Sequence, residues 1–269
     1  MSEIRNKAAE LDAVLAKMGA VAVAVSGGVD SMTLAVVAGR RLGARAEMVH
    51  ATSPAVPPEA SARVQAYAAR EGWRLDVIDA GEFADPDYLA NPANRCFFCK
   101  TNLYGTIAAR TRATVVSGTN LDDLGDWRPG LKAAESHGVR HPYVEAGIDK
   151  STVRALARAL GLHDLAELPA APCLSSRLAT GIRVTGERLR LVHAVERLIA
   201  EELAPRTVRC RLFHDGVAIQ LDPDGLERIT GAPAAPLRRT IEQMAGESAV
   251  RYEPYRMGSA FLRTAADGA

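Results

Sequence analysis

A short loop of small residues near the N-terminus, Ser26-Gly27-Gly28-Val29-Asp30-Ser31, is the segment best suited to bind a phosphate. Backbone N–H groups in such a loop close around phosphate oxygens, and the positive end of the following helix dipole lies behind them. Ser26 and Ser31 add hydroxyl donors. Asp30 would repel a phosphate directly, so we expect it to hold a Mg²⁺ ion that bridges the phosphates.

This loop differs from the two commonest phosphate-binding motifs. It lacks the Gly-Lys-Ser/Thr ending of a Walker motif and the Gly-x-Gly-x-x-Gly of a dinucleotide-binding fold. A kinase or a simple dehydrogenase is therefore disfavoured. The alternative to a phosphate site is a tight strand-to-helix turn that needs glycine geometry and binds nothing.

The cysteines form the second group of chemically active residues. Cys96, Cys99, Cys173 and Cys210 are too few and too unevenly spread for a disulfide scaffold in a chain of 269 residues. The Cys-x-x-Cys pair suits an iron–sulfur cluster, zinc, a redox dithiol or two small buried residues at helical spacing, and spacing alone leaves these open. We expect Cys210, on an alternating strand, to be buried in the core.

An acidic loop and an arginine follow in the middle of the chain. Asp122, Asp123 and Asp126 place three carboxylates in five positions of a glycine-containing loop. They would suit a metal or a nucleotide, and a solvated acidic loop is the alternative. Arg128 stands in an Arg-Pro-Gly turn that would aim its guanidinium at a phosphate or a carboxylate.

Further polar residues lie in the C-terminal part. Ser175, Ser176 and Arg177 follow Cys173 closely and would suit an anionic group, although a Ser-rich turn at a domain junction would look the same. Arg209 and Arg211 alternate on a predicted strand, so both side chains should point to one face. Together they could grip a phosphate, or they could belong to an exposed strand face.

Composition places the chain among ordinary globular proteins. It is 48% hydrophobic and 24% charged, which excludes a disordered chain. The net charge of +1 offers no broad attraction to nucleic acid or lipid. No apolar stretch approaches the ~20 residues of a membrane span, and residues 1–7 do not resemble a secretory signal. We expect a cytoplasmic protein without a nucleic-acid or membrane partner.

The chain alternates strands and helices in its first part. The strands are predicted at residues 20–25, 46–50, 75–79 and 114–117, and the helices at 11–18, 31–42, 59–71, 102–110 and 150–160. This alternation predicts a doubly wound α/β domain, residues 1–168, with a parallel sheet covered on both faces. Residues 118–141 interrupt the rhythm and are predicted to form a long functional loop.

The pattern changes from residue 169 onward. Helices are predicted at residues 187–203 and 235–245, and short strands at 208–213, 217–221 and 249–252. This segment predicts a second, smaller α+β domain, residues 169–269. In the first domain we expect a nucleotide at the carboxyl ends of the strands, where the glycine loop lies.

The glycine loop after an apolar strand resembles the pyrophosphate loop of the PP-loop ATP pyrophosphatases. Within that superfamily the chain is similar to the LarE family, sulfur transferases that build the nickel-pincer nucleotide cofactor. The similarity runs from about residue 11 to residue 252. It is carried by residues 94–100 (Asn-Arg-Cys-Phe-Phe-Cys-Lys), 118–123 (Gly-Thr-Asn-Leu-Asp-Asp), 126–130 (Asp-Trp-Arg-Pro-Gly) and 172–177 (Pro-Cys-Leu-Ser-Ser-Arg).

The resemblance implies an ATP-dependent enzyme that adenylates the carboxylates of pyridinium-3,5-biscarboxylic acid mononucleotide and converts them to thiocarboxylates. LarE-like proteins with one cysteine, matching Cys173, give up its sulfur. Those with three cysteines, matching Cys96, Cys99 and Cys173, hold a [4Fe-4S] cluster with one iron open for a labile sulfide. This chain has the three-cysteine pattern. The implied cofactors are ATP, Mg²⁺ and the cluster, and a homo-oligomer is expected by analogy.

The resemblance also assigns roles to individual residues. Asp30, Cys173 and Arg177 are the expected catalytic residues, and Cys96, Cys99 and Cys173 the expected cluster ligands. The expected ATP-binding residues are Ser26, Gly27, Gly28, Asp30, Ser31, Gly118, Thr119 and Asn120. The expected substrate-binding residues are Asp126, Arg128, Ser176, Arg209 and Arg211.

One departure from the family and three rival functions remain. Relatives tend to have an Arg-Ile-Glu-like strand segment where this chain has Ala218-Ile219-Gln220-Leu221, so the resemblance leaves an acidic metal ligand of the second domain unassigned. The rival functions are a PP-loop ligase that uses ammonia or an amine, a tRNA thiolase, and a nucleotide- or iron–sulfur-binding protein without catalysis. A tRNA substrate would call for a basic surface, which a net charge of +1 does not indicate.

Overall fold

The chain forms two compact units. A computed structural model describes residues 2–125, 129–170, 172–256 and 258–260. The first unit comprises Met1–Phe83 and Cys96–Ala171, and the second comprises Ala84–Arg95 and Pro172–Ala269. The predicted α/β class, a parallel sheet with a second α+β part, is confirmed. No described helix is long and apolar enough to cross a lipid bilayer.

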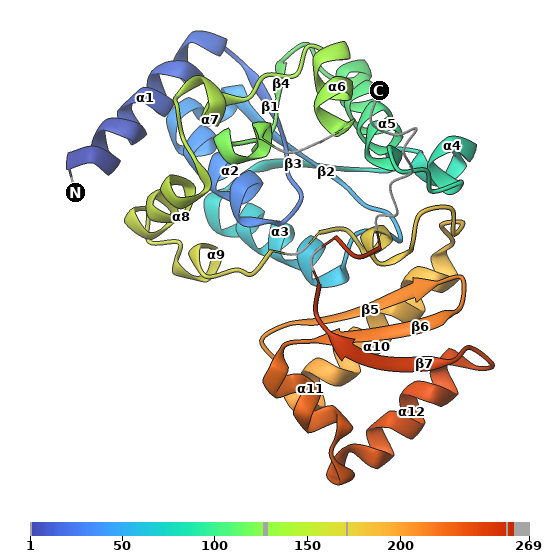
Figure 1. The fold of residues 1–269 in the computed structure, drawn as a ribbon. Helices are drawn as coiled ribbons and strands as arrows, with labels where there is room; N and C mark the ends of the chain where they lie inside the picture. Colours follow the sequence, from blue (N-terminus) through green and yellow to red (C-terminus); the bar gives the residue numbers. More distant parts are fainter. Residues whose placement is uncertain (1, 126–128, 171, 257, 261–269) are drawn as a thin grey trace. The chain divides into compact units, whose positions relative to one another are not determined.

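The first unit is built on a four-stranded parallel sheet of order β3-β2-β1-β4 (Figure 1). The strands are β1 (Val21–Ala24), β2 (Ala46–Ala51), β3 (Arg74–Ile78) and β4 (Thr114–Val116). The chain proceeds from β1 outward to β3 and then returns to β4 on the other side of β1. The strand order therefore reverses between β1 and β4, which is where sheets of this kind bind ligands.

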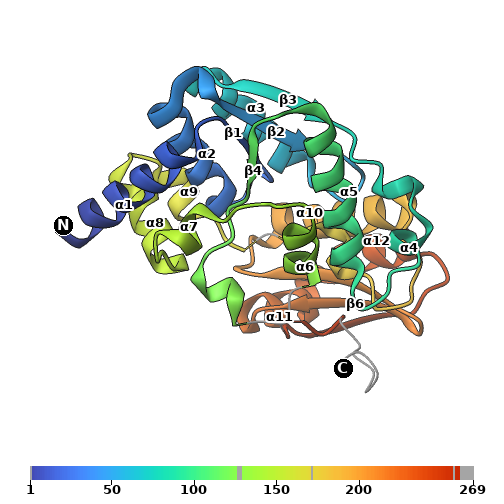
Figure 2. The same ribbon diagram turned by 90° about the horizontal axis from the view of Figure 1, so that it is seen from above.

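Helices cover both faces of this sheet because successive side chains of β1 point in opposite directions. Val21 and Val23 belong to one buried cluster with residues of α1, α2 and α8, whereas Ala22 belongs to another with residues of α5. Figure 2 shows α1 and α8 on one side of the sheet and α5 on the other. The helices of this unit are α1 (Ser2–Met18), α2 (Val29–Leu42), α3 (Pro58–Glu71), α5 (Arg95–Arg110), α6 (Pro129–Ser136), α7 (Pro142–Glu145), α8 (Lys150–Ala159) and α9 (His163–Ala166).

Two sequence-based boundaries are wrong. The predicted loop at residues 118–141 contains a 3-10 turn, η3 (Leu121–Leu124), and the helix α6, whose Ala134 packs into the core cluster beside α5. Pro129 starts α6 because proline is well tolerated at the first helical position. The helix predicted from residue 102 begins at Arg95 instead, so it carries Cys96 and Cys99 in its first turns.

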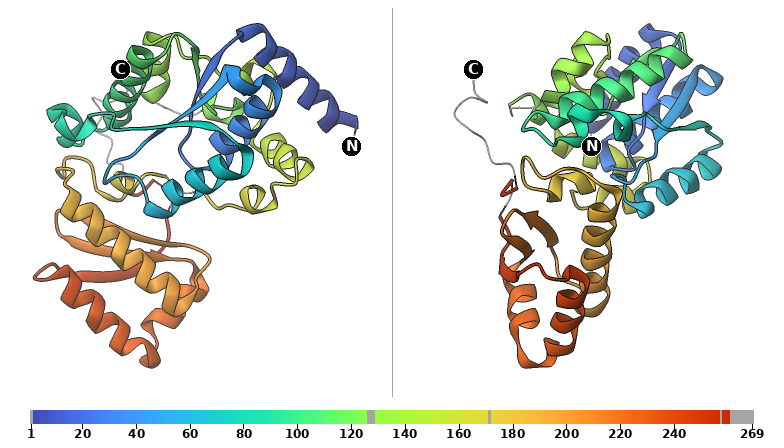
Figure 3. Two further views of the ribbon diagram at one scale, coloured as in Figure 1. Left: turned by 180° about the vertical axis from the view of Figure 1, so that it is seen from behind. Right: turned by 90° about the vertical axis from the view of Figure 1, so that its right-hand side faces the viewer.

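The second unit has a three-stranded mixed sheet of order β5-β6-β7. Its elements are α4 (Pro86–Leu89), η4 (Leu174–Arg177), α10 (Gly186–Leu203), β5 (Val208–Phe213), β6 (Gly216–Leu221), α11 (Pro223–Thr230), α12 (Ala235–Ala245) and β7 (Val250–Pro254). Cys210 and Ile219 pair across β5 and β6 and are fully buried, which confirms the prediction for Cys210. In this unit α10 packs against β5, α11 packs against β6 and β7, and α12 packs against α10 and α11. Figure 3 shows the long gold helix α10 beside the orange strands of the sheet.

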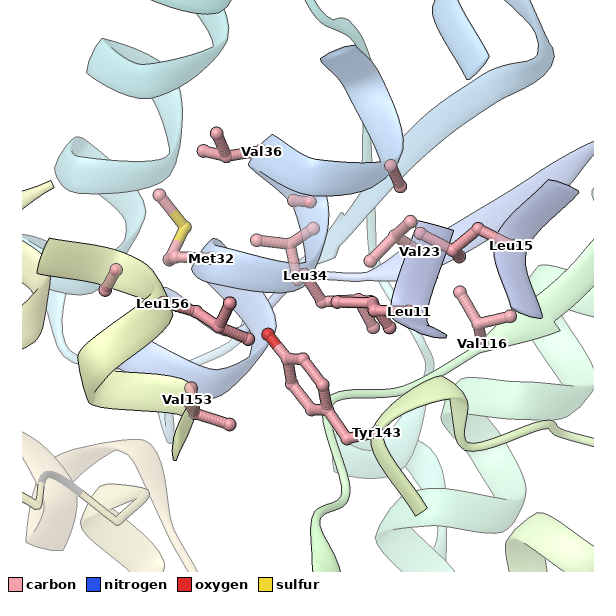
Figure 4. Packing of buried hydrophobic residues seen from close by; sticks show 14 of the residues in the cluster. Leu11, Leu15, Val23, Met32, Leu34, Val36, Val116, Tyr143, Val153 and Leu156 are labelled. Atoms are coloured by element: carbon pink, nitrogen blue, oxygen red, sulfur yellow. The ribbon is translucent and has the colours of Figure 1, made fainter. Parts of the chain in front are cut away.

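Leu34 tests the main core of the first unit. It is fully buried among Leu11, Val23 and Leu156 (Figure 4). Leu34→Ala should lower the free energy of unfolding of this unit by about 2–5 kcal/mol, because it removes buried apolar area and leaves a cavity. Urea unfolding followed by circular dichroism measures the change. Leu124→Ala is the control: its side chain is 50% exposed, so the same truncation should change the free energy by about 0.5 kcal/mol or less.

Candidate functional site

The loop after β1 and the loop after β4 are in backbone contact. Gly27 has a φ of +82°, and a Cβ there would lie 2.7 Å from the Ala60 carbonyl oxygen of α3. A Cβ on Gly118 would lie 2.8 Å from the Ser31 backbone nitrogen. Real Cβ atoms do not approach other atoms so closely, so both positions require glycine. The two loops therefore meet at the carboxyl ends of β1 and β4.

Hydrogen bonds within the first loop give it one conformation. The Ser31 hydroxyl accepts from the Ser26 backbone N–H at 3.0 Å, lies 3.0 Å from the Ser26 hydroxyl and donates to the Gly28 carbonyl at 3.3 Å. Arg63 donates to the Gly27 carbonyl at 2.8 Å. Gly28 is the N-cap of α2 and offers no side-chain acceptor to the first N–H groups of that helix. Such N–H groups, with the helix dipole behind them, are suited to an anion.

A buried histidine supports the loop where it leaves the sheet. Nδ1 of His50 lies 2.8 Å from the Val25 carbonyl, and Nε2 lies 2.9 Å from the Ser61 hydroxyl. A carbonyl only accepts, so Nδ1 carries the proton and Nε2 accepts from Ser61. Burial lowers the pKa of His50, which keeps the ring neutral. His50 was not predicted as a site residue, although a histidine in a strand that is otherwise mostly apolar is a usable signal.

Asp30 is the point where three segments converge. Its carboxylate accepts from Nζ of Lys150 at 2.7 and 2.5 Å and from Nδ2 of Asn120 at 3.4 Å, and its carbonyl accepts from the Tyr143 hydroxyl at 3.1 Å. Figure 4 shows Tyr143 pointing toward α2. Burial raises the pKa of Tyr143 well above its usual value, so it stays a donor.

Lys150 and Tyr143 were not predicted as site residues. Lys150 is the first residue of α8, where its positive charge opposes the helix dipole. A cation at that position is unfavourable unless an anion balances it. A lysine at the start of a predicted helix therefore indicates a nearby carboxylate. Asp30 supplies the balancing charge.

The predicted residues after β4 lie in the same region. The Thr119 hydroxyl is 3.0 Å from the Ser117 hydroxyl, which is 2.9 Å from Nδ1 of His141. Asn120 caps η3 in a capping box with Asp123. Gly118, Thr119 and Asn120 therefore join the glycine loop around one edge of the sheet.

Two carboxylates of the acidic loop accept hydrogen bonds from backbone N–H groups. Asp123 accepts from the Asn120 N–H at 3.0 Å, and Asp122 accepts from the Lys150 N–H at 3.1 Å. No three His, Cys, Asp or Glu side chains within the described ranges form a group that could hold a metal ion. Asp126 and Arg128, predicted to bind substrate, lie outside the described residues.

The three predicted cluster cysteines are carried by a helix and a turn. Cys96 is exposed and Cys99 half-buried, and their spacing of three places them side by side on α5. Cys173 is exposed at the N-cap of η4, where its side chain makes no capping hydrogen bond. Cys96 and Cys99 belong to the first unit and Cys173 to the second. Thiolates are the usual ligands of iron–sulfur clusters, so the donor chemistry fits.

Arg177 holds the turn that carries Cys173. Its guanidinium makes a two-point ion pair with Glu196, with Nε and Nη2 both at 3.0 Å, and both side chains are nearly buried. Nη1 donates to the Pro172 carbonyl at 2.7 Å and lies 3.1 Å from the Ser176 hydroxyl. The donors of Arg177 are thus largely taken by the protein itself, and Ser176 is drawn into the same network.

Arg209 and Arg211 are two positions apart on β5, so they lie on one face of the strand, as predicted. Their partners in β6 are Gln220 and Ala218. Arg211 donates to the Gln220 side chain at 2.7 Å and to the Ser176 carbonyl at 3.2 Å. Burial lowers the pKa of both arginines, and the nearby Arg177 charge adds to the effect. The Gln220 side chain in turn donates to Glu253 at 2.8 Å.

Comparisons with known proteins place the chain among its relatives. No protein-family model matches it. It is 38% identical to the uncharacterized protein slr1717 of Synechocystis sp., over 85% of this chain and 83% of the relative. It is 30% identical to the pyridinium-3,5-bisthiocarboxylic acid mononucleotide synthase of Lactiplantibacillus plantarum, over 82% of this chain and 81% of the relative. It is 23% identical to the uncharacterized protein MJ0830 of Methanocaldococcus jannaschii over 76% of this chain and 78% of the relative.

The parallel sheet, its switch point and the glycine loop define an α/β protein with a PP-loop-like fold. The 30% identity with the synthase, over about four fifths of both chains, identifies the family within this fold class. The chain belongs to the family of pyridinium-3,5-bisthiocarboxylic acid mononucleotide synthases, the LarE family.

Gly118→Ala tests the contact between the two loops. The new methyl group would overlap the backbone of Asp30 and Ser31, so we expect the first unit to lose about 1–3 kcal/mol of stability. Gly125→Ala is the matched control, because a Cβ there meets nothing closer than the Asp122 carbonyl at 3.9 Å. Thermal unfolding of the two variants measures the difference. Equal melting temperatures would contradict the close approach of the loops.

Proposed function

We propose that the protein is an ATP-dependent sulfur transferase that adenylates the carboxylates of pyridinium-3,5-biscarboxylic acid mononucleotide and converts them to thiocarboxylates. The observation that carries this proposal is the 30% identity with a synthase named for the bisthiocarboxylic acid product, over four fifths of both chains. The geometry of the glycine loop at the switch point supports the use of a nucleotide.

The first unit supplies the groups that would bind ATP. The N–H groups at the start of α2 and the hydroxyls of Ser26 and Ser31 would receive the phosphates. Lys150 forms an ion pair with Asp30. When Mg²⁺ and ATP bind, the Asp30 carboxylate would turn to the metal and the Lys150 ammonium to the phosphates. The Asp30 carboxylate would then exchange one cation for another, and the Lys150 ammonium one anion for another, so neither charge would be left unpaired.

The reaction has two steps. A carboxylate oxygen of the substrate attacks the α-phosphorus of ATP; an O–P bond forms while the bond to pyrophosphate breaks, and the product is an acyl-adenylate. A sulfide sulfur then forms a bond to the acyl carbon, the carbon–oxygen bond to AMP breaks, AMP leaves with the electron pair, and the S–H proton passes to solvent. Orientation of the two reactants is the main catalytic contribution available to the protein.

Cys96, Cys99 and Cys173 are the residues we propose as ligands of a [4Fe-4S] cluster. Such a cluster would keep one iron open to carry the sulfide that the second step consumes. The thiol of Cys173 is exposed, and Cys96 and Cys99 lie next to each other on α5, which suits this role. Arg177, whose donors are bound to Glu196 and to the turn, would position Cys173, although it was expected to act directly.

The second unit offers a positive face for the nucleotide phosphate of the substrate. Arg209 and Arg211 share that face, with Ser176 connected to Arg211 through its carbonyl. We propose that Arg209 contacts the phosphate and that Arg211 orients the surrounding backbone. Asp126 and Arg128 are proposed as further substrate contacts from the sequence alone.

The cysteine variants separate the two steps. Anaerobically purified protein should contain about four irons per chain and, with Mg²⁺, ATP and the biscarboxylate mononucleotide, release pyrophosphate and form thiocarboxylate detectable by mass spectrometry. Cys173→Ala should lose iron and thiocarboxylate but release pyrophosphate within about twofold of the wild-type rate. Cys210→Ala, which removes a buried thiol, should keep its iron. Iron-free protein after anaerobic reconstitution would eliminate the cluster, and absence of pyrophosphate release would eliminate the adenylation.

Lys150→Met tests the exchange of partners at Asp30. The variant loses one charge-assisted hydrogen bond to the phosphates, worth about 1.5–3 kcal/mol, so ATP should bind at least about tenfold more weakly. Isothermal titration with Mg²⁺ and ATP measures the affinity. Lys17→Met, on the exposed side of α1, is the control for loss of a lysine. A lower melting temperature with unchanged ATP affinity would assign Lys150 a purely structural role.

A further inference from the structure

Residues 84–95 are a short excursion of the chain into the second unit, while the residues on either side belong to the first. This segment is joined to the stretch that follows Cys173. The Val184 N–H donates to the Leu89 carbonyl and the Gly181 N–H donates to the Asn91 carbonyl, both at 2.9 Å. The excursion is therefore an integral part of the second unit.

Asn91 is the centre of this junction. Its side chain is 1% exposed and its φ is +55°, a left-handed conformation that asparagine tolerates better than most residues. Nδ2 donates to the Ala179 carbonyl at 2.8 Å and to the Leu178 carbonyl at 3.5 Å. Oδ1 accepts from Nη1 of Arg95. A buried residue in this conformation persists only where its surroundings determine it strongly.

Two more side chains of the excursion reach Ser175. Nη1 of Arg95, which is 3% exposed, donates to the Ser175 carbonyl at 3.0 Å. The Tyr88 hydroxyl lies 2.8 Å from the Ser175 hydroxyl, and both residues are buried. We call Tyr88, Asn91 and Arg95 the clasp.

The clasp completes a set of buried donors around one turn. Arg177 donates to the carbonyls of Pro172 and Cys173, Arg95 to that of Ser175 and Arg211 to that of Ser176. Almost every carbonyl of residues 172–176 is thus held by a guanidinium. The thiol of Cys173, by contrast, is exposed on this rigid turn. Rigid backbone beneath an exposed reactive side chain is the arrangement that orients a reactant.

We propose that Asn91 and Arg95 are positioning residues for sulfur transfer: the clasp fixes the 172–179 turn so that Cys173 presents its thiol in one orientation. This inference rests on the proposed function, since it assigns the clasp to the second step and not to adenylation. Neither residue touches the reacting atoms; both act through the backbone of the turn.

Asn91→Gly is the decisive variant, because glycine keeps the positive φ while the hydrogen bonds to Leu178, Ala179 and Arg95 are lost. Ala90→Gly is its matched control: it adds the same backbone freedom at an exposed neighbour and removes no side-chain hydrogen bond. Arg95→Lys keeps a positive donor and should give an intermediate effect. All variants are compared as full-length, anaerobically purified protein.

Three readouts decide the proposal. In Asn91→Gly, amide hydrogen exchange at Ser176 and Leu178, whose N–H groups are bonded within the turn, should be at least about tenfold faster, with no change in β1. The kcat for thiocarboxylate formation should fall about tenfold, whereas pyrophosphate release and the KM for ATP stay within about twofold. Ala90→Gly should match the wild type in all three.

Two results would overturn the role of the clasp, and a different result would remove the proposed function. Faster exchange with unchanged thiocarboxylate formation would show that the clasp only stabilises the turn, and unchanged exchange would show that it does not hold the turn at all. Either result overturns the proposal. Wild-type protein that neither releases pyrophosphate nor forms thiocarboxylate would remove the proposed function, and exchange at Ser176 and Leu178 would then still show whether the clasp fixes Cys173.

Discussion

The first unit depends on the approach of two backbones at Gly118. Without a side chain at this position, the loop after β4 comes within contact of Ser31 and carries Asn120 to the Asp30 carboxylate. The chain then continues through Tyr143 to Lys150, and both of these residues also bind Asp30. Asp30, at the start of α2, thereby accepts hydrogen bonds from three segments: its carboxylate from Asn120 and Lys150, and its carbonyl from Tyr143. The switch point of the sheet explains why they can meet, because the chain leaves β1 and β4 in opposite directions.

In the second unit, charge is buried in a different manner. Arg177 has a carboxylate partner in Glu196, but Arg95 and Arg211 direct their donors to backbone carbonyls and amide side chains. The planar guanidinium suits such acceptors because its donors point in fixed directions. Glu196 also accepts from the Cys210 N–H, and Asp222 caps α11, so both carboxylates are bonded to the backbone of their own unit. The turn at Cys173 owes its shape to these buried cations.

The features that follow local rules could be predicted from the sequence. Apolar runs ended by glycine gave the parallel strands and the loop of residues 26–31, because both patterns lie within a few consecutive residues. The start of α5 was missed because Phe97 and Phe98 are adjacent aromatic residues without helical periodicity, and α6 because Pro129 and Gly130 resemble a turn. Lys150 and Asn91 could not be found in this way. Their partners lie 120 and 88 residues away in the chain, and only the tertiary fold brings them together.

The excursion of residues 84–95 also bears on how the protein is made. Asn91 and Arg95 leave the ribosome long before the stretch they bind, since Ser175 follows Arg95 by 80 residues. At about 5–20 residues per second, this segment waits several seconds without its partners while the rest of the first unit is being synthesised. The chain also passes between the two units three times, after residues 83, 95 and 171. A fragment that begins at residue 172 would lack the buried side chains of residues 84–95. The second unit is therefore not encoded by one continuous stretch of the gene and cannot be moved to another protein as one.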